Sequence, residues 1–182
     1  MWPEILFVLW FFLPAGVANV TPILVAKLGW FRFLDRPLDQ GLVWRGKRLL
    51  GDHKTWRGLV VGVICGVVTA VIQNNFWRLE SYLQIDFFGG LVDVILIGTL
   101  LSVGALMGDA MKSFIKRRVD VPSGKSLLVF DQIDYVVGAA LITFPFVPLK
   151  WYQELLAVLF WGSLSLFMSY IGFLYRFKKE PI

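Results

Sequence analysis

Long apolar segments dominate this chain and decide what it can fold into. Hydrophobic residues make up 57% of the 182 positions and charged residues 17%, which is less charge than a soluble domain normally carries. Several segments approach or exceed the roughly 18–20 residues that an α-helix needs to cross a bilayer, and they lack the alternation of a membrane β-strand. The sequence predicts one all-α domain over residues 1–182, a polytopic transmembrane bundle of five spans at about 2–26, 58–72, 87–107, 133–149 and 151–175.

The positive charges indicate how the bundle is oriented. All but two of the 18 lysines and arginines, Arg78 and Lys150, fall in the loops at about 27–57 and 108–132 or in the C-terminal tail. Basic loops remain on the cytoplasmic side of a membrane. We therefore expect a cell-membrane protein with the N-terminus outside and with both loops and the C-terminus in the cytoplasm.

Small residues recur at spacings that bring helices close together. Gly58, Gly62 and Gly66 repeat every four residues in the second span, and Gly104 and Gly108 do so in the third. In lipid, such stripes allow close backbone contact between helices. We interpret them as packing surfaces, with a sliding or hinging helix as the alternative.

Three acids lie next to the predicted cytoplasmic face. Asp109 follows the third span, whereas Asp131 and Asp134 open the fourth and, three residues apart, share a helix face. Acids at a helix start also act as caps, but Asp109, expected near a helix C-terminus, needs a cation such as Lys112 or a metal. Carboxylate oxygens suit Mg²⁺, so we predict a shared Mg²⁺ site for the three acids.

Basic residues in the second loop suggest binding of an anion. Lys116 and Arg117 satisfy the positive-inside rule whether or not they contact phosphate. Lys125 follows Pro-Ser-Gly, where backbone N–H groups and a lysine can hold an anion. It is not a P-loop, because the earlier glycine would have to stand at Val119.

The segment 51–58, with sequence GDHKTWRG, precedes the second span. Thr55 is a candidate N-cap, while Lys54 and Arg57 can bind phosphate groups. His53 is the single histidine, and no Ser-His-Asp arrangement is visible in the sequence. The sequence also lacks a His/Cys cluster that would indicate a zinc site. Asn19 is a polar residue inside the first span, suited equally to helix contacts and to substrate.

Together these motifs resemble the CDP-archaeol synthases, archaeal CTP-dependent cytidylyltransferases that act on unsaturated archaetidic acid, an ether-linked isoprenoid glycerol phosphate. The resemblance covers nearly the whole chain and rests on Asn19-x-x-Pro22, residues 51–58, Gly108-Asp109, Lys116-Arg117 and residues 122–134. The last of these is also similar, in part, to the signature of the longer CDP-diacylglycerol synthases.

The resemblance implies an enzyme that uses CTP and Mg²⁺, releases pyrophosphate and forms CDP-archaeol, with membrane lipids but no nucleic acid as partners. We assign catalytic roles to Asp131, Asp134 and Lys125, and metal binding to Asp109, Asp131 and Asp134. Substrate binding is assigned to Asn19, His53, Lys54, Thr55, Arg57, Lys116, Arg117, Ser123 and Gly124. Lys54 and Arg57 face either the lipid phosphate or one end of CTP, and the sequence does not specify an oligomeric state.

Other functions remain as alternatives at this point. Another phospholipid nucleotidyl- or phosphotransferase would use similar charges, although the Asp-Gly ending of many phosphatidyltransferases is absent because Tyr135 follows Asp134. An ion-coupled transporter would place ionisable groups near the middle of the membrane, and a scaffold would not need three converging acids.

Overall fold

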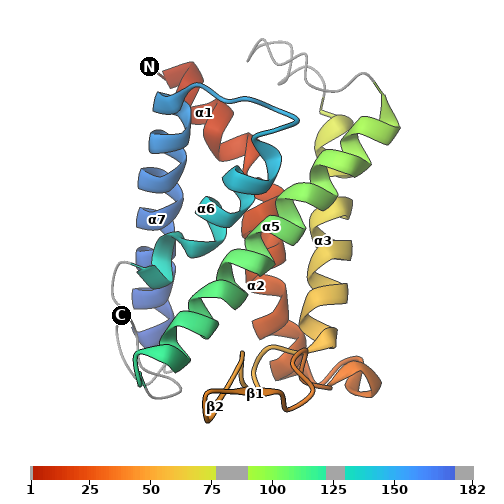
Figure 1. Ribbon diagram of the computed structural model, residues 1–182. Helices are drawn as coiled ribbons and strands as arrows, with labels where there is room; N and C mark the ends of the chain where they lie inside the picture. The colour runs from red at the N-terminus through yellow and green to blue at the C-terminus, as the bar shows by residue number, and fades with distance from the viewer. Residues whose placement is uncertain (1, 77–89, 122–129, 175–182) are drawn as a thin grey trace.

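The computed structural model describes residues 2–76, 90–121 and 130–174 (Figure 1). Helices dominate this part of the chain, as the sequence predicts, and a short hairpin is the departure from an all-α fold. The elements are α1 (Trp2–Phe11), α2 (Leu13–Leu28), the 3-10 turn η1 (Arg32–Leu34), β1 (Val43–Trp44), β2 (Lys47–Arg48), α3 (Trp56–Asn74), α5 (Leu91–Arg118), α6 (Phe130–Thr143) and α7 (Trp151–Leu174).

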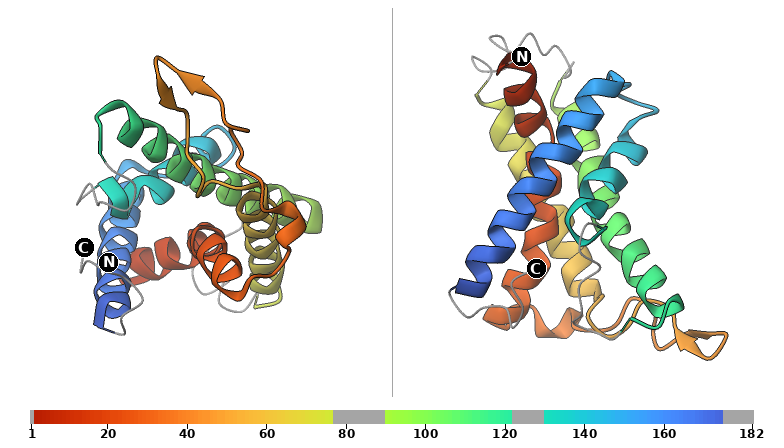
Figure 2. Two further views of the ribbon diagram at one scale, coloured as in Figure 1. Left: turned by 90° about the horizontal axis from the view of Figure 1, so that it is seen from below. Right: turned by 90° about the vertical axis from the view of Figure 1, so that its left-hand side faces the viewer.

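The connection between α2 and α3 lies at one end of the bundle. It carries η1 and the β1–β2 hairpin, and it lies beside the C-terminal end of α5 and the start of α3 (Figure 1). The starts of α1, α5 and α7 lie at the opposite end (Figures 1 and 2). This arrangement places most of the described basic residues at the end that carries the α2–α3 connection, called here the loop end.

Within the described part of the chain, three helices are long and apolar enough to cross a membrane: Trp56–Asn74, Leu91–Arg118 and Trp151–Ile171. The predicted first span is not one straight helix, because α1 and α2 meet at an angle of 43°. Pro14 has no N–H to bond the carbonyl of Trp10. That carbonyl instead accepts a hydrogen bond of 2.7 Å from Nε2 of Gln73 in α3, so a neighbouring helix satisfies the group that the proline leaves free.

Two predicted boundaries were wrong. The expected loop 108–132 is helical as far as Arg118, because α5 runs for 28 residues, and Asp109 therefore lies well inside the helix. The expected span 133–149 ends early, since α6 has 14 residues and stops at Thr143. Pro145 and Pro148, which follow in the sequence, cannot donate the backbone hydrogen bonds that would continue it.

Glycines allow α5 and α6 to cross almost backbone to backbone. A Cβ atom at Gly104 would lie 2.7 Å from Cα of Ala139, and one at Gly108 would overlap the carbonyl of Asp134. Gly138 faces the same crossing from α6, against the backbone of Gly104 and Gly108. This close packing sets Asp109, next to Gly108, beside the first turns of α6.

Candidate active site

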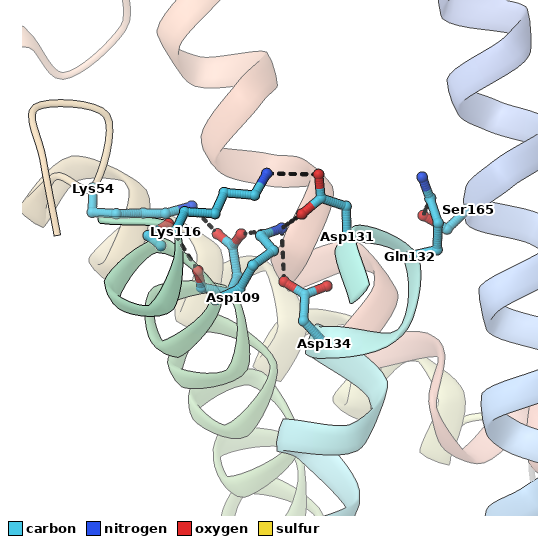
Figure 3. Close-up of polar contacts among 9 residues, drawn as sticks. Lys54, Asp109, Lys116, Asp131, Gln132, Asp134 and Ser165 are labelled. Atoms are coloured by element: carbon cyan, nitrogen blue, oxygen red, sulfur yellow. Dashed lines mark hydrogen bonds and ion pairs between the residues drawn. The ribbon is translucent and has the colours of Figure 1, made fainter. Parts of the chain in front are cut away.

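Three aspartates from α5 and α6 surround one lysine ammonium at the loop end of the α5–α6 crossing (Figure 3). Nζ of Lys112 lies 2.9 Å from Oδ1 of Asp109 and 2.7 Å from Oδ2 of Asp134. The same Nζ lies 3.8 Å from Oδ1 of Asp131. The carboxylates thus converge, as the sequence predicts, and the point on which they converge holds a positive charge.

Two further lysines hold the outer sides of these carboxylates. Lys54, from the α2–α3 connection, forms an ion pair with Asp109, and Lys116 donates a hydrogen bond of 2.6 Å to Oδ2 of Asp131. We call Lys54, Asp109, Lys112, Lys116, Asp131 and Asp134 the aspartate–lysine cluster. Their side chains are largely buried, and partly desolvated charges of this kind persist only when they are paired.

Asp134 is the least satisfied member of the cluster. Its side chain is 8% exposed, and its Oδ1 is buried without a hydrogen-bond partner among the described residues. In the same part of the chain, no three His, Cys, Asp or Glu side chains are grouped closely enough to form a metal site. Lys112 separates the carboxylates, so a metal would have to take the place of its ammonium.

Contacts with α7 fix the orientation of α6. Oγ of Ser165 donates a hydrogen bond of 2.6 Å to Oε1 of Gln132 (Figure 3). One turn further along, the hydroxyl of Tyr135 donates to the carbonyl of Trp161 at 3.0 Å. Gln132 and Tyr135 thus anchor one side of α6, and Asp131 and Asp134 lie on the side facing α5.

An open cleft of about 330 Å³ lies beside the cluster. One wall comes from α5 and the other from the α2–α3 connection. Its lining is strongly basic and consists of Arg48, Leu50, Gly51, Asp52, His53, Lys54, Asp109, Lys112, Ser113, Lys116 and Arg117. The buried Nε of Arg117 has no hydrogen-bond partner among the described residues. Such a cleft suits a polyanionic ligand.

Asp39 shapes the wall formed by the α2–α3 connection. Its carboxylate accepts hydrogen bonds from the backbone N–H groups of Gly41, Leu50 and Gly51 at 3.2, 3.0 and 3.1 Å. Arg48 adds two more, at 2.7 Å from Nη2 and 3.3 Å from Nε. The Arg48 guanidinium, helped by these N–H donors, holds the pKa of Asp39 well below its usual range against the opposing effect of burial.

The structure brings some of the predicted substrate-binding residues to the cleft. His53, Lys54, Lys116 and Arg117 line it. Ser123, Gly124 and Lys125 lie outside the described residues.

Thr55, Arg57 and Asn19 are absent from the lining of the cleft. Thr55 caps α3 as predicted, because its Oγ1 accepts from the N–H of Gly58 at 3.3 Å. Arg57 is buried and pairs with Asp35 at 3.0 Å. Asn19 is half-buried within α2.

Sequence reasoning missed three contributors to this site. Lys112 was expected only as one possible partner of Asp109, yet it occupies the centre of the cluster. Its three-residue spacing from Asp109 would have placed both on one helix face, had residues 108–118 been expected to form a helix. Arg48 and Asp39 gave no local signal, because their pairing depends on the fold of the α2–α3 connection.

Comparison with known proteins identifies the family. A family model described as CarS-like, CDP-archaeol synthase, matches residues 1–181. The chain is 36% identical over 179 residues to the CDP-archaeol synthase of Thermococcus gammatolerans, covering 95% of this chain and 94% of that protein. It is 32% identical over 171 residues to the CDP-archaeol synthase of Methanocaldococcus jannaschii, covering 93% and 90%.

A solved structure agrees with this result. It belongs to an intramembrane enzyme for archaeal membrane lipids biosynthesis, and it matches with a TM-score of 0.72 at 28% identity over 90% of this chain and 93% of that one. The apolar helices and this match indicate a multi-pass membrane protein. The chain belongs to the family of CDP-archaeol synthases.

Proposed function

We propose that this chain transfers a cytidylyl group from CTP to unsaturated archaetidic acid, giving CDP-archaeol and pyrophosphate. The family and its solved relative support the reaction. The observation that carries it is the aspartate–lysine cluster beside a basic cleft at one end of an apolar bundle. A site at that position gives a water-soluble nucleotide and a membrane lipid access to the same charged groups.

The reaction requires little acid–base chemistry from the protein. An oxygen of the lipid phosphate attacks the α-phosphorus of CTP, a new P–O bond forms, and the bond from the α-phosphorus to the bridging oxygen breaks as pyrophosphate leaves. A phosphate monoester loses its second proton at about pH 6, so the nucleophile is already ionised near neutral pH. The single histidine, His53, is therefore not required as a general base.

Bringing two anions together is the difficulty of this reaction, and the cleft is suited to it. Lys116 and Arg117 reach the cleft from the last turns of α5, and Lys54 reaches it from the opposite wall. Charged groups held in place before the reaction stabilise developing negative charge and align the reactants. We assign Lys116 and Arg117 to the triphosphate, as we do Lys125, and Lys54 to the lipid phosphate or the other end of CTP.

Mg²⁺ is the cofactor that the acids of the cluster suit. Asp131, Asp134 and Asp109 supply hard oxygen donors, and the buried Oδ1 of Asp134 has no other described partner. When bound, Mg²⁺ would supply charge neutralisation between the two anionic substrates. Lys112 occupies the point between the carboxylates, so its ammonium holds the acids together in the free enzyme and would have to give up that point for the three acids to hold Mg²⁺.

We further propose five passes, with α1 and α2 forming one bent pass and the short helix α6 forming the fourth. The loop end then faces the cytoplasm, with the N-terminus outside and the C-terminus inside. The positive-inside rule supports this orientation, since the described loop end is rich in lysine and arginine. CTP would reach the cleft from the cytoplasm.

The reaction is tested with CTP labelled on either the α- or the γ-phosphorus, together with the purified protein, Mg²⁺ and the isoprenoid glycerol phosphate. We expect the α-label to enter the organic phase and the γ-label to remain in aqueous pyrophosphate. Transfer of the γ-label to lipid would instead indicate a phosphotransferase, and transfer of neither would reject the proposal. Activity that persists in excess EDTA would reject the requirement for Mg²⁺ but not the reaction.

A further inference from the structure

The β1–β2 hairpin presents three apolar side chains that are largely exposed. Leu42, Val43 and Trp44 are 60%, 59% and 48% exposed. The turn itself is tight, because Arg45 and Gly46 both adopt positive φ angles of 51° and 75°, which is the geometry of a two-residue hairpin turn. A rigid turn of this kind holds the apolar residues in a fixed direction.

The hairpin is fastened to the last turns of α5. The ring of Trp44 stacks on Phe114, with centroids 5.9 Å apart and planes inclined by 19°. Arg118 lies against both rings, its Cζ 4.8 and 4.7 Å from their centroids, and its Nη1 donates to the carbonyl of Trp44 at 2.6 Å. Lys47 on β2 pairs with Asp120, just beyond the helix, at 2.6 Å.

An apolar stripe on α5 leads to this attachment. Met107, Met111, Ile115 and Val119 are all exposed and follow one another at intervals of four residues along one side of the helix. Lys112 and Lys116 point from a different side, into the cleft. In a membrane helix, exposed apolar side chains face lipid. The stripe therefore indicates that α5 contacts lipid as far as its last turns, where the hairpin is attached.

We propose that the hairpin is an interfacial anchor, which inserts Leu42, Val43 and Trp44 into the headgroup region of an anionic leaflet. Tryptophan is enriched at that depth. The guanidinium of Arg45 lies over the Trp44 ring, 4.9 Å from its centroid, and forms no ion pair with any described residue. It is therefore available to lipid phosphate groups, each basic residue near such a surface contributing about 1 kcal/mol.

The anchor would also fix the position of the cleft. Arg48, at the end of β2, and the segment from Leu50 to Lys54 line it. A hairpin held in the headgroup layer keeps this wall at the depth of lipid phosphates. The proposal does not depend on the reaction assigned to the enzyme.

The experiment places a spin label on Val43→Cys in a Cys65→Ser background, in the full chain reconstituted into phosphatidylglycerol nanodiscs. The collision rate of the label with oxygen is compared with that for a water-soluble nickel chelate. We expect the label at position 43 to favour oxygen several-fold more than a label on Asp52→Cys, which is exposed beside the cleft. Equal preference at both positions would overturn the proposal, as would shielding of position 43 from both reagents, which indicates a protein contact.

A second variant tests the proposed interaction of Arg45 with anionic headgroups. Arg45→Gln is combined with the label at position 43. In phosphatidylglycerol nanodiscs, it should reduce about fivefold the ratio of labels inserted in the headgroup layer to labels exposed to water. In phosphatidylcholine nanodiscs, the same substitution should leave the ratio unchanged. An equal effect in both lipids would overturn the assignment of Arg45 to anionic headgroups.

Discussion

Two sets of buried carboxylates stand on either side of the cleft, and they are satisfied in opposite ways. Asp39 accepts from three backbone N–H groups and a paired guanidinium, all fixed by the fold of the connection between α2 and α3. The acids of the aspartate–lysine cluster are met instead by the ammonium groups of flexible side chains. Asp134 keeps a buried oxygen with no described hydrogen-bond donor.

This difference separates a structural acid from an exchangeable one. Fixed N–H groups cannot leave Asp39 without unfolding the connection, so its charge serves to hold the cleft wall. Lysine side chains can rotate away, and an ammonium is a strongly hydrated point charge on a flexible stem. A carboxylate held by lysines can therefore exchange its partner for a metal ion, whereas one held by the backbone cannot.

The largest effect on turnover is expected from substitution of Asp134. Asp134→Asn keeps the size of the side chain but removes the negative charge that a metal requires. Loss of a ligand in metal-assisted phosphate chemistry removes several kcal/mol of stabilisation, and turnover should fall about 10³-fold. Turnover is measured as transfer of the α-label from CTP to lipid.

The matched control for this variant is Asp93→Asn, in the first turn of α5 at the opposite end of the bundle. It should retain activity close to that of the unaltered protein, and both variants should remain soluble and monodisperse in detergent. Activity of Asp134→Asn within a few-fold of the original would remove this residue from the metal site.

Asp39→Asn should weaken the fold of the α2–α3 connection rather than act directly on turnover. The change removes a charged acceptor from Arg48 and from the backbone donors, and hydrogen bonds to charged groups contribute about 1.5–3 kcal/mol. We expect the connection to open more often, so that limited trypsin digestion cuts faster at the exposed Arg45. Unchanged digestion together with a large loss of turnover would contradict the structural role of Asp39.

The sequence predicts the apolar bundle and the convergence of the three acids, because both follow from local patterns. Span length, basic loops and the three-residue spacing of Asp131 and Asp134 can be read directly. The end of α5 differs from the prediction, because the charges from Asp109 to Arg118 are typical of a loop, whereas the apolar residues at four-residue intervals among them continue the helix. The role of Asp39 depends on donors up to 12 residues away and on the turns that bring them close, which no spacing rule predicts.

A smaller effect is expected when Lys112 is removed. Lys112→Gln eliminates the ammonium that competes with a divalent ion between Asp109 and Asp134. Because two charges about 4 Å apart near a protein surface interact by about 4 kcal/mol before screening, Mn²⁺ should bind at least about tenfold more tightly. The measurement is electron paramagnetic resonance of free Mn²⁺ in the absence of nucleotide.

Lys112→Arg is the control for that measurement, since it keeps the positive charge and should bind Mn²⁺ no more tightly than the original protein. Weaker or unaltered binding in Lys112→Gln would show that the lysine does not occupy the position of the metal. The turnover of Lys112→Gln need not be known for this test, because metal binding is measured directly.

The smallest expected effect concerns pH, and it tests the structural role of the Asp39 charge. The pKa of Asp39 is lowered, chiefly by Arg48, so its contribution is complete above the unfolded value of about 3.9 and is lost as the pH falls through the lower folded value. A spin label at position 43 should therefore report the same hairpin mobility from about pH 8 to pH 5 and greater mobility only below about pH 4. In Asp39→Asn, which lacks the titrating group, mobility should be high throughout and independent of this transition. A transition in that variant at the same pH would assign it to the lipid headgroups or to another carboxylate, and the contrast drawn for Asp39 would then rest on its hydrogen bonds alone.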